Sequence, residues 1–116
     1  IYGPTFKIPY NKLTEREHAW IRVSFKYFTE YDINESPASL VIEMDHNKGQ
    51  YIEKYRYWNL EKYDYKVNRW NNFSVDYLTP YPLSVRKDIF KIYVYIRGDK
   101  EIYIDNMHVE AFERKW

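Results

Sequence analysis

Side chains that commonly carry out catalysis are few in this sequence and lie far apart. The three histidines, His18, His46 and His108, are isolated, and none stands at a spacing typical of a metal site. The absence of cysteine excludes thiolate catalysis, disulfides and cysteine-bound zinc. No Gly-x-Ser-x-Gly sequence is present to expose a nucleophilic serine at a tight turn. We therefore expect a chain that is not an enzyme.

Acidic residues offer another route to catalysis, because two carboxyl groups about 5–10 Å apart can hydrolyse a glycosidic bond. Four acidic residues fall within stretches where apolar and polar side chains alternate: Glu43, Asp45, Glu53 and Asp76. In such a stretch the polar residues lie on the side of the strand that faces water. We interpret each of the four as part of a solvated strand face.

Aromatic rings are the chemical groups present in excess. The 116 residues include 4 Trp, 14 Tyr and 6 Phe, which is 21% of the chain. The face of such a ring can stack on the C–H groups of a sugar, while neighbouring polar groups bind the sugar hydroxyls. A small β-domain cannot bury so many rings, and clustered exposed rings usually mark a binding surface.

Five residues are predicted to bind the ligand because they lie out of phase with the apolar rows of their strands or accompany such a ring. They are Trp58, Tyr95, Trp20, Arg56 and Tyr93. Trp70, in contrast, opens an inward-facing strand and is expected in the core. A single ring in a small β-protein more often packs in the core or against a neighbouring strand, so that role remains an alternative at each position.

The elements that must position these rings are short strands, since apolar and polar residues alternate along most of the chain. The alternating stretches are 19–27, 40–45, 51–58, 72–77, 90–97, 102–105 and 107–112. Gly98 and Asp99 are predicted to form a tight hairpin turn, because glycine tolerates the positive φ angle that such turns need. Helical signals are confined to one turn at residues 14–17. This pattern predicts an all-β fold, an antiparallel two-sheet β-sandwich or a barrel, in a single domain spanning residues 1–116.

Charge gives no sign of an electrostatic partner. The 18 Lys and Arg residues nearly balance the 17 Asp and Glu residues, so no nucleic-acid partner is expected. The aromatic and basic residues at 54–58 would suit single-stranded nucleic acid, but acidic residues flank them. No apolar run approaches the roughly 18–20 residues of a membrane span, so no membrane insertion is expected. Because the chain opens with Ile1 and has no signal-peptide pattern, we expect a domain from a longer or processed protein.

The last third of the chain carries a more specific pattern: WNNF at 70–73, DIFKIYVY at 88–95, IYIDNM at 102–107 and VEAF at 109–112. This order is similar to the closing half of jelly-roll carbohydrate-binding modules, the galactose-binding-like β-sandwiches attached to many secreted glycoside hydrolases. The resemblance implies a jelly-roll-like sandwich in an extracellular or cell-surface bacterial protein, beside a catalytic domain. It also implies that Asp105 binds a structural calcium ion.

Two functions therefore remain open. The first is a non-catalytic carbohydrate-binding or accessory module that stacks the sugar rings of a polysaccharide or oligosaccharide on exposed aromatic residues. The second is a structural β-sandwich whose outer rings contact a neighbouring domain or another protein. Both functions require exposed rings, so composition alone does not separate them.

Overall fold

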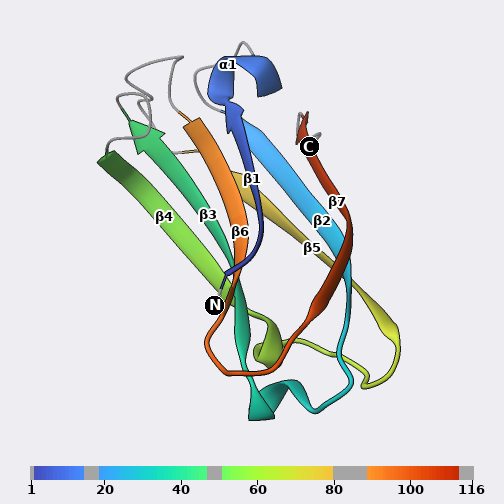
Figure 1. Cartoon of the computed structure of the whole chain (residues 1–116). Coiled ribbons are helices and arrows are strands. Elements are labelled where there is room, and N and C mark those ends of the chain that lie inside the picture. The colour runs from blue at the N-terminus through green and yellow to red at the C-terminus, as the bar shows by residue number, and fades with distance from the viewer. Residues whose placement is uncertain (1, 15–18, 47–50, 80–88, 113–116) are drawn as a thin grey trace.

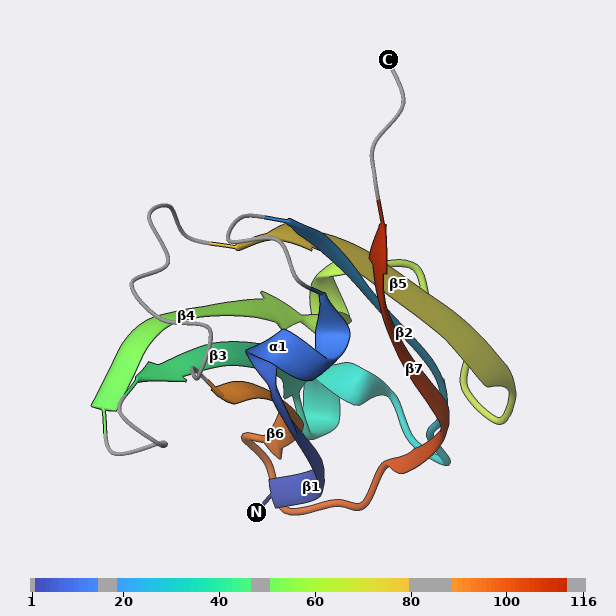
Figure 2. The same cartoon turned by 90° about the horizontal axis from the view of Figure 1, so that it is seen from above.

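The chain folds into two antiparallel β-sheets that pack face to face (Figures 1 and 2). The computed structural model describes residues 2–14, 19–46, 51–79 and 89–112. The strands are β1 (Tyr2–Pro9), β2 (Trp20–Phe28), β3 (Ala38–His46), β4 (Tyr51–Asn59), β5 (Trp70–Leu78), β6 (Ile89–Ile96) and β7 (Tyr103–Phe112). The large sheet has the order β1-β6-β3-β4 and the small sheet the order β5-β2-β7. The prediction of an all-β, two-sheet sandwich is therefore confirmed.

The chain passes repeatedly between the two sheets, in the manner of a jelly roll. β2 lies in the small sheet, β3 and β4 in the large sheet, β5 in the small, β6 in the large and β7 in the small. Short helical turns at α1 (Tyr10–Leu13), η1 (Ile33–Glu35) and η2 (Leu60–Lys62) occur along these connections. Within the described ranges, no helix has the length and apolar character needed to cross a membrane.

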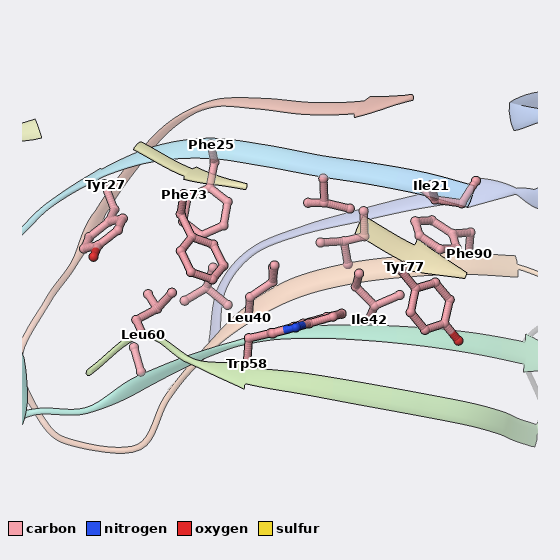
Figure 3. Packing of buried hydrophobic residues seen from close by; sticks show 14 of the residues in the cluster. Ile21, Phe25, Tyr27, Leu40, Ile42, Trp58, Leu60, Phe73, Tyr77 and Phe90 are labelled. Atoms are coloured by element: carbon pink, nitrogen blue, oxygen red, sulfur yellow. The ribbon is translucent and has the colours of Figure 1, made fainter. Parts of the chain in front are cut away.

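The core lies between the sheets and is built from alternate residues of the central strands. From β2 these residues are Ile21, Val23, Phe25 and Tyr27, and from β6 they are Phe90, Ile92, Val94 and Ile96. Figure 3 labels four of them, Ile21, Phe25, Tyr27 and Phe90. Each of them is at most 6% exposed. The predicted apolar rows of these two strands therefore face the core, because successive side chains on a strand point to opposite faces of its sheet.

The connection from β6 to β7 is not the predicted hairpin. β6 pairs with β1 and β3 in the large sheet, whereas β7 pairs with β2 in the small sheet. The segment around Gly98 therefore carries the chain from one layer to the other. Its glycine is needed because the backbone packs against Ser36, and a Cβ at Gly98 would lie 2.1 Å from Ser36 Oγ.

The two ends of the sequence pattern also differ from expectation. Residues 102–105 and 107–112 were predicted as separate strands, but β7 is one strand with a bulge near Asn106, whose φ angle is 54°. The sequence pattern predicted neither β1 nor α1. In the structure, β1 joins the large sheet by pairing with β6. Of the helical turn predicted at residues 14–17, residues 15–17 lie outside the described part of the chain.

Candidate functional site

The five residues predicted to bind the ligand lie in three separate places. Trp58 and Arg56 lie on the face of β4 that turns toward the core, since they pair with Leu40 and Ile42. Tyr93 and Tyr95 lie on the outer face of the large sheet, and Trp20 on the outer face of the small sheet. Because the core separates these two outer faces, the five residues do not form a common ligand site.

The prediction that Trp58 is exposed is wrong. Trp58 is only 8% exposed, and its ring meets the ring of Tyr77 edge-on at a centroid distance of 6.4 Å (Figure 3). β4 is an edge strand, so the same face reaches solvent two residues earlier, at the exposed Arg56. The guanidinium carbon of Arg56 lies 4.8 Å from the Trp58 ring centroid. Arg56 thus packs on a core tryptophan instead of standing beside a surface platform.

The outer face of the large sheet, called here the large-sheet face, carries three tyrosines. Tyr57 is 55% exposed, Tyr95 is 37% exposed, and Tyr93 is half-buried. The strand register places Tyr57 and Tyr93 on either side of Val41. The predicted outward orientation of Tyr93 and Tyr95 is therefore confirmed.

Two carboxyl groups on the large-sheet face are buried, so the prediction that Glu43 and Asp45 form a solvated strand face is wrong. Glu43 is 6% exposed and Asp45 is 7% exposed. The Tyr93 hydroxyl donates a 2.6 Å hydrogen bond to Glu43, and the Lys91 ammonium lies 3.9 Å from the same carboxylate. Asp45 Oδ1 accepts no hydrogen bond within the described residues. Burial, and then the charge of Glu43, raises the pKa of Asp45.

The outer face of the small sheet, called here the small-sheet face, consists of five rows, each with one residue from β5, β2 and β7. In order along the sheet the rows are Trp70–Phe28–Tyr103, Asn72–Lys26–Asp105, Ser74–Ser24–His108, Asp76–Arg22–Glu110 and Leu78–Trp20–Phe112. The face thus has an apolar row at each end and three polar rows between them. This arrangement results from strand register, because each strand by itself supplies only one apolar residue to each end.

The first row, Trp70–Phe28–Tyr103, is a continuous series of aromatic rings. The centroid of Phe28 lies 5.6 Å from that of Trp70 and 6.2 Å from that of Tyr103. Trp70 is 52% exposed and Tyr103 is 45% exposed, so the prediction that Trp70 belongs to the core is wrong. Trp70 pairs directly with Phe28, whose side chain points outward. Because directly paired residues of neighbouring strands point to the same face of the sheet, Trp70 also points outward.

The adjoining row, Asn72–Lys26–Asp105, provides polar groups beside the rings. All three residues are exposed, and neither Asn72 nor Lys26 forms a side-chain hydrogen bond or ion pair with another described residue. Asp105 Oδ1 accepts a 2.8 Å hydrogen bond from the backbone N–H of Asn106 at the bulge. Within the described residues, no group of three or more His, Asp or Glu side chains is arranged to hold a metal ion. Calcium binding by Asp105 stays a prediction.

Of the remaining acidic candidates, only Asp76 has a side chain that the structure describes. Asp76 is engaged with Arg22, whose Nε lies 2.8 Å from Asp76 Oδ1. The side chain of Glu53 lies outside the described part of the structure. On the small-sheet face, the accessible groups include the aromatic rings of Trp70 and Tyr103 and the polar side chains of the adjoining row.

Comparison of this chain with models of protein families, with curated proteins and with solved structures found no match.

Proposed function

We propose that this chain is a non-catalytic carbohydrate-binding module whose Trp70–Phe28–Tyr103 row stacks against sugar rings. The observation that carries the proposal is the exposure of Trp70 and Tyr103, 52% and 45%, on either side of Phe28. An indole and a phenol ring held on either side of a phenylalanine ring offer apolar faces to the C–H groups of a pyranose. Rings fixed by their neighbours also lose little side-chain entropy when a ligand binds.

The next row supplies the polar half of the interaction. The Lys26 ammonium and the Asn72 amide donate hydrogen bonds, and the Asn72 and Asp105 side-chain oxygens accept them. Since Lys26 and Asn72 are not engaged with other described residues, they can bind sugar hydroxyls without breaking a side-chain hydrogen bond or ion pair to any of those residues. A shallow, water-exposed site of this kind binds with modest affinity. The resemblance to jelly-roll modules adds the proposal that the domain acts outside a bacterial cell, beside a catalytic domain.

The test is native electrophoresis of the purified 116-residue protein through gels that contain soluble polysaccharides. We expect at least one polysaccharide to retard the wild-type protein. Trp70→Ala and Tyr103→Ala should each weaken the retardation by about tenfold in affinity, the size expected for losing one ring-stacking contact. Tyr57→Ala is the matched control, because it removes a ring of similar exposure from the opposite, large-sheet face.

Two results would contradict this proposal. If no polysaccharide retards the wild-type protein, the outer rings are better explained as a contact surface for a neighbouring domain or another protein. If Tyr57→Ala weakens binding while Trp70→Ala and Tyr103→Ala leave it unchanged, the sugar site lies on the large-sheet face instead.

A further inference from the structure

The small-sheet face has a second apolar row, Leu78–Trp20–Phe112, at the end opposite to Trp70. The Trp20 and Phe112 ring centroids lie 6.4 Å apart with an interplanar angle of 36°, and Leu78 is 41% exposed. The Arg22 guanidinium carbon lies 4.4 Å from the Phe112 ring centroid, over the ring. This row therefore resembles the first in having an indole packed beside a phenylalanine ring on the sheet surface.

The two apolar rows are separated by a distance that suits an extended ligand. Trp20 and Phe28 are eight residues apart on β2, which corresponds to about 26 Å at roughly 3.3 Å per residue. The row midway between them has the short side chains of Ser24 and Ser74 on two of its three strands. A chain of several sugar rings could follow β2 and β5 over these serines and reach both apolar rows.

The long side chain of Arg22 lies along the sheet and does not project across this path. Arg22 Nε and Nη2 lie 2.8 Å and 3.3 Å from the two carboxylate oxygens of Asp76, and the guanidinium also packs on Phe112. These contacts hold Arg22 against the sheet. The guanidinium can then line the path of a ligand that crosses this row.

The charges of the small-sheet face do not favour a polyanionic ligand. Its charged residues are two basic ones, Arg22 and Lys26, and three acidic ones, Asp76, Asp105 and Glu110. Basic and acidic side chains alternate across the rows, so no continuous positive stripe is present to neutralise a polyanion. The face is instead suited to a neutral ligand with many hydroxyl groups.

Resting on the proposed function, we infer that the ligand is a neutral, linear polysaccharide that lies along β2 and contacts both apolar rows of the small-sheet face. The Trp70–Phe28–Tyr103 row binds one part of the chain and the Leu78–Trp20–Phe112 row binds another. Because the two contacts belong to one ligand molecule, the second contact forms at a high effective concentration. Affinity should therefore depend on chain length.

The experiment compares four variants, Trp70→Ala, Trp20→Thr, Leu78→Lys and Tyr57→Ala, with the wild-type protein. The gels contain neutral xyloglucan, galactomannan, arabinoxylan or hydroxyethylcellulose, or anionic polygalacturonate. Calorimetric titration then uses the disaccharide and longer oligosaccharides from the retarding polymer. Trp20→Thr removes the ring and replaces it with a β-branched side chain, which β-strands favour. Leu78→Lys obstructs the same row from an exposed position. Thermal unfolding shows whether Trp20→Thr is folded, and if it is not, Leu78→Lys still tests the row.

We expect a neutral polysaccharide to retard the wild-type protein more than polygalacturonate does. Trp20→Thr and Leu78→Lys should weaken polysaccharide binding by about tenfold, as Trp70→Ala does, and Tyr57→Ala should leave it unchanged. The wild-type protein should bind the longer oligosaccharides at least about tenfold more tightly than the disaccharide.

Several results would overturn the inference. If Trp70→Ala weakens binding while folded Trp20→Thr and Leu78→Lys do not, the site is confined to one row and only the proposed function stands. Equal affinity for the disaccharide and the longer chains, or preferred binding of polygalacturonate, would overturn the extended, neutral ligand. If none of the polymers retards the wild-type protein, the proposed function itself fails.

Discussion

At the scale of single residues, Asp45 combines a position on the outer face of a sheet with nearly complete burial. Only 7% of the residue is exposed, and one of its carboxylate oxygens accepts no hydrogen bond within the described residues. Burial and the neighbouring charge of Glu43 both disfavour the ionised form, while Lys91 and Lys7 favour it. The raised pKa shows that the first two effects dominate, so the charged form of Asp45 destabilises the fold.

The raised pKa of Asp45 predicts how the stability of the fold depends on pH. The pKa of Asp45 in the folded protein is raised from its ordinary value of 3.8, so the folded protein holds this proton more tightly than the unfolded chain does. The contribution of Asp45 to the free energy of unfolding is therefore full below about pH 4 and falls as pH rises through the raised pKa. Asp45→Asn should remove this decline. Urea unfolding of the wild-type protein and of Asp45→Asn, from about pH 4 upward through the raised pKa, measures this difference. If the free energy of unfolding of the two proteins depends on pH in the same way, the prediction is wrong.

At the scale of elements, the β6–β7 connection shows how the loops fasten the two sheets together. The Arg97 N–H donates a 2.8 Å hydrogen bond to the Pro37 carbonyl, and the Lys100 N–H donates a 3.0 Å hydrogen bond to Ser36 Oγ. The Arg97 guanidinium also pairs with Glu61. These contacts join the segment before β7 to the segment before β3, so the connection is fixed by long-range packing.

Gly98 is the position where this packing leaves no room for a side chain. In Gly98→Ala the new Cβ would lie 2.1 Å from Ser36 Oγ and 2.5 Å from Ser36 Cα, and Ser36 is fully buried. We expect the free energy of unfolding to fall by about 1–3 kcal/mol, the usual cost of overpacking. Asp99→Ala, at the exposed neighbouring position, should change it by no more than about 0.5 kcal/mol. Urea denaturation compares the two, and equal stability of both variants would show that the segment can move aside.

At the scale of the whole molecule, stability depends on the contact between the two sheets. Trp58 of the large sheet meets Tyr77 of the small sheet at 82° between ring planes, and Tyr77 also lies 6.3 Å from the ring of Phe90. Rings from both layers thus close the edge of the core near β4. Burial of large aromatic side chains is a major source of stability in a domain of this size.

Two adjacent residues of β4 should therefore respond very differently to truncation. Trp58→Ala should lower the free energy of unfolding by about 3–5 kcal/mol, because it opens a cavity between the sheets. Tyr57→Ala, which points outward from the next position, should cost about 1 kcal/mol or less. Thermal and urea unfolding of the two variants checks this. A larger loss for Tyr57→Ala would indicate that the large-sheet face is itself part of the stabilising packing.

The sequence allowed part of the candidate site to be predicted. Residue types pointed to exposed rings with polar neighbours, and Trp20, Tyr93 and Tyr95 do face outward. The Trp70–Phe28–Tyr103 row was missed because its three rings come from β5, β2 and β7. Only their hydrogen-bonded register brings them together, and no spacing along the chain records it.

The sequence by itself determined that the chain is all-β and which residues share one side of each strand. That information is local, because the two-residue alternation of side chains is a property of the extended backbone. The apolar rows of β2 and β6 also indicated which side of these two strands is buried. Tertiary structure alone decided which strands are neighbours and which way Trp58 and Trp70 face. Trp58 and Trp70 ended opposite to expectation because strand pairing between segments far apart in sequence decides whether a ring faces the other sheet or solvent. Trp58 pairs with the buried Leu40, and Trp70 pairs with the outward-pointing Phe28.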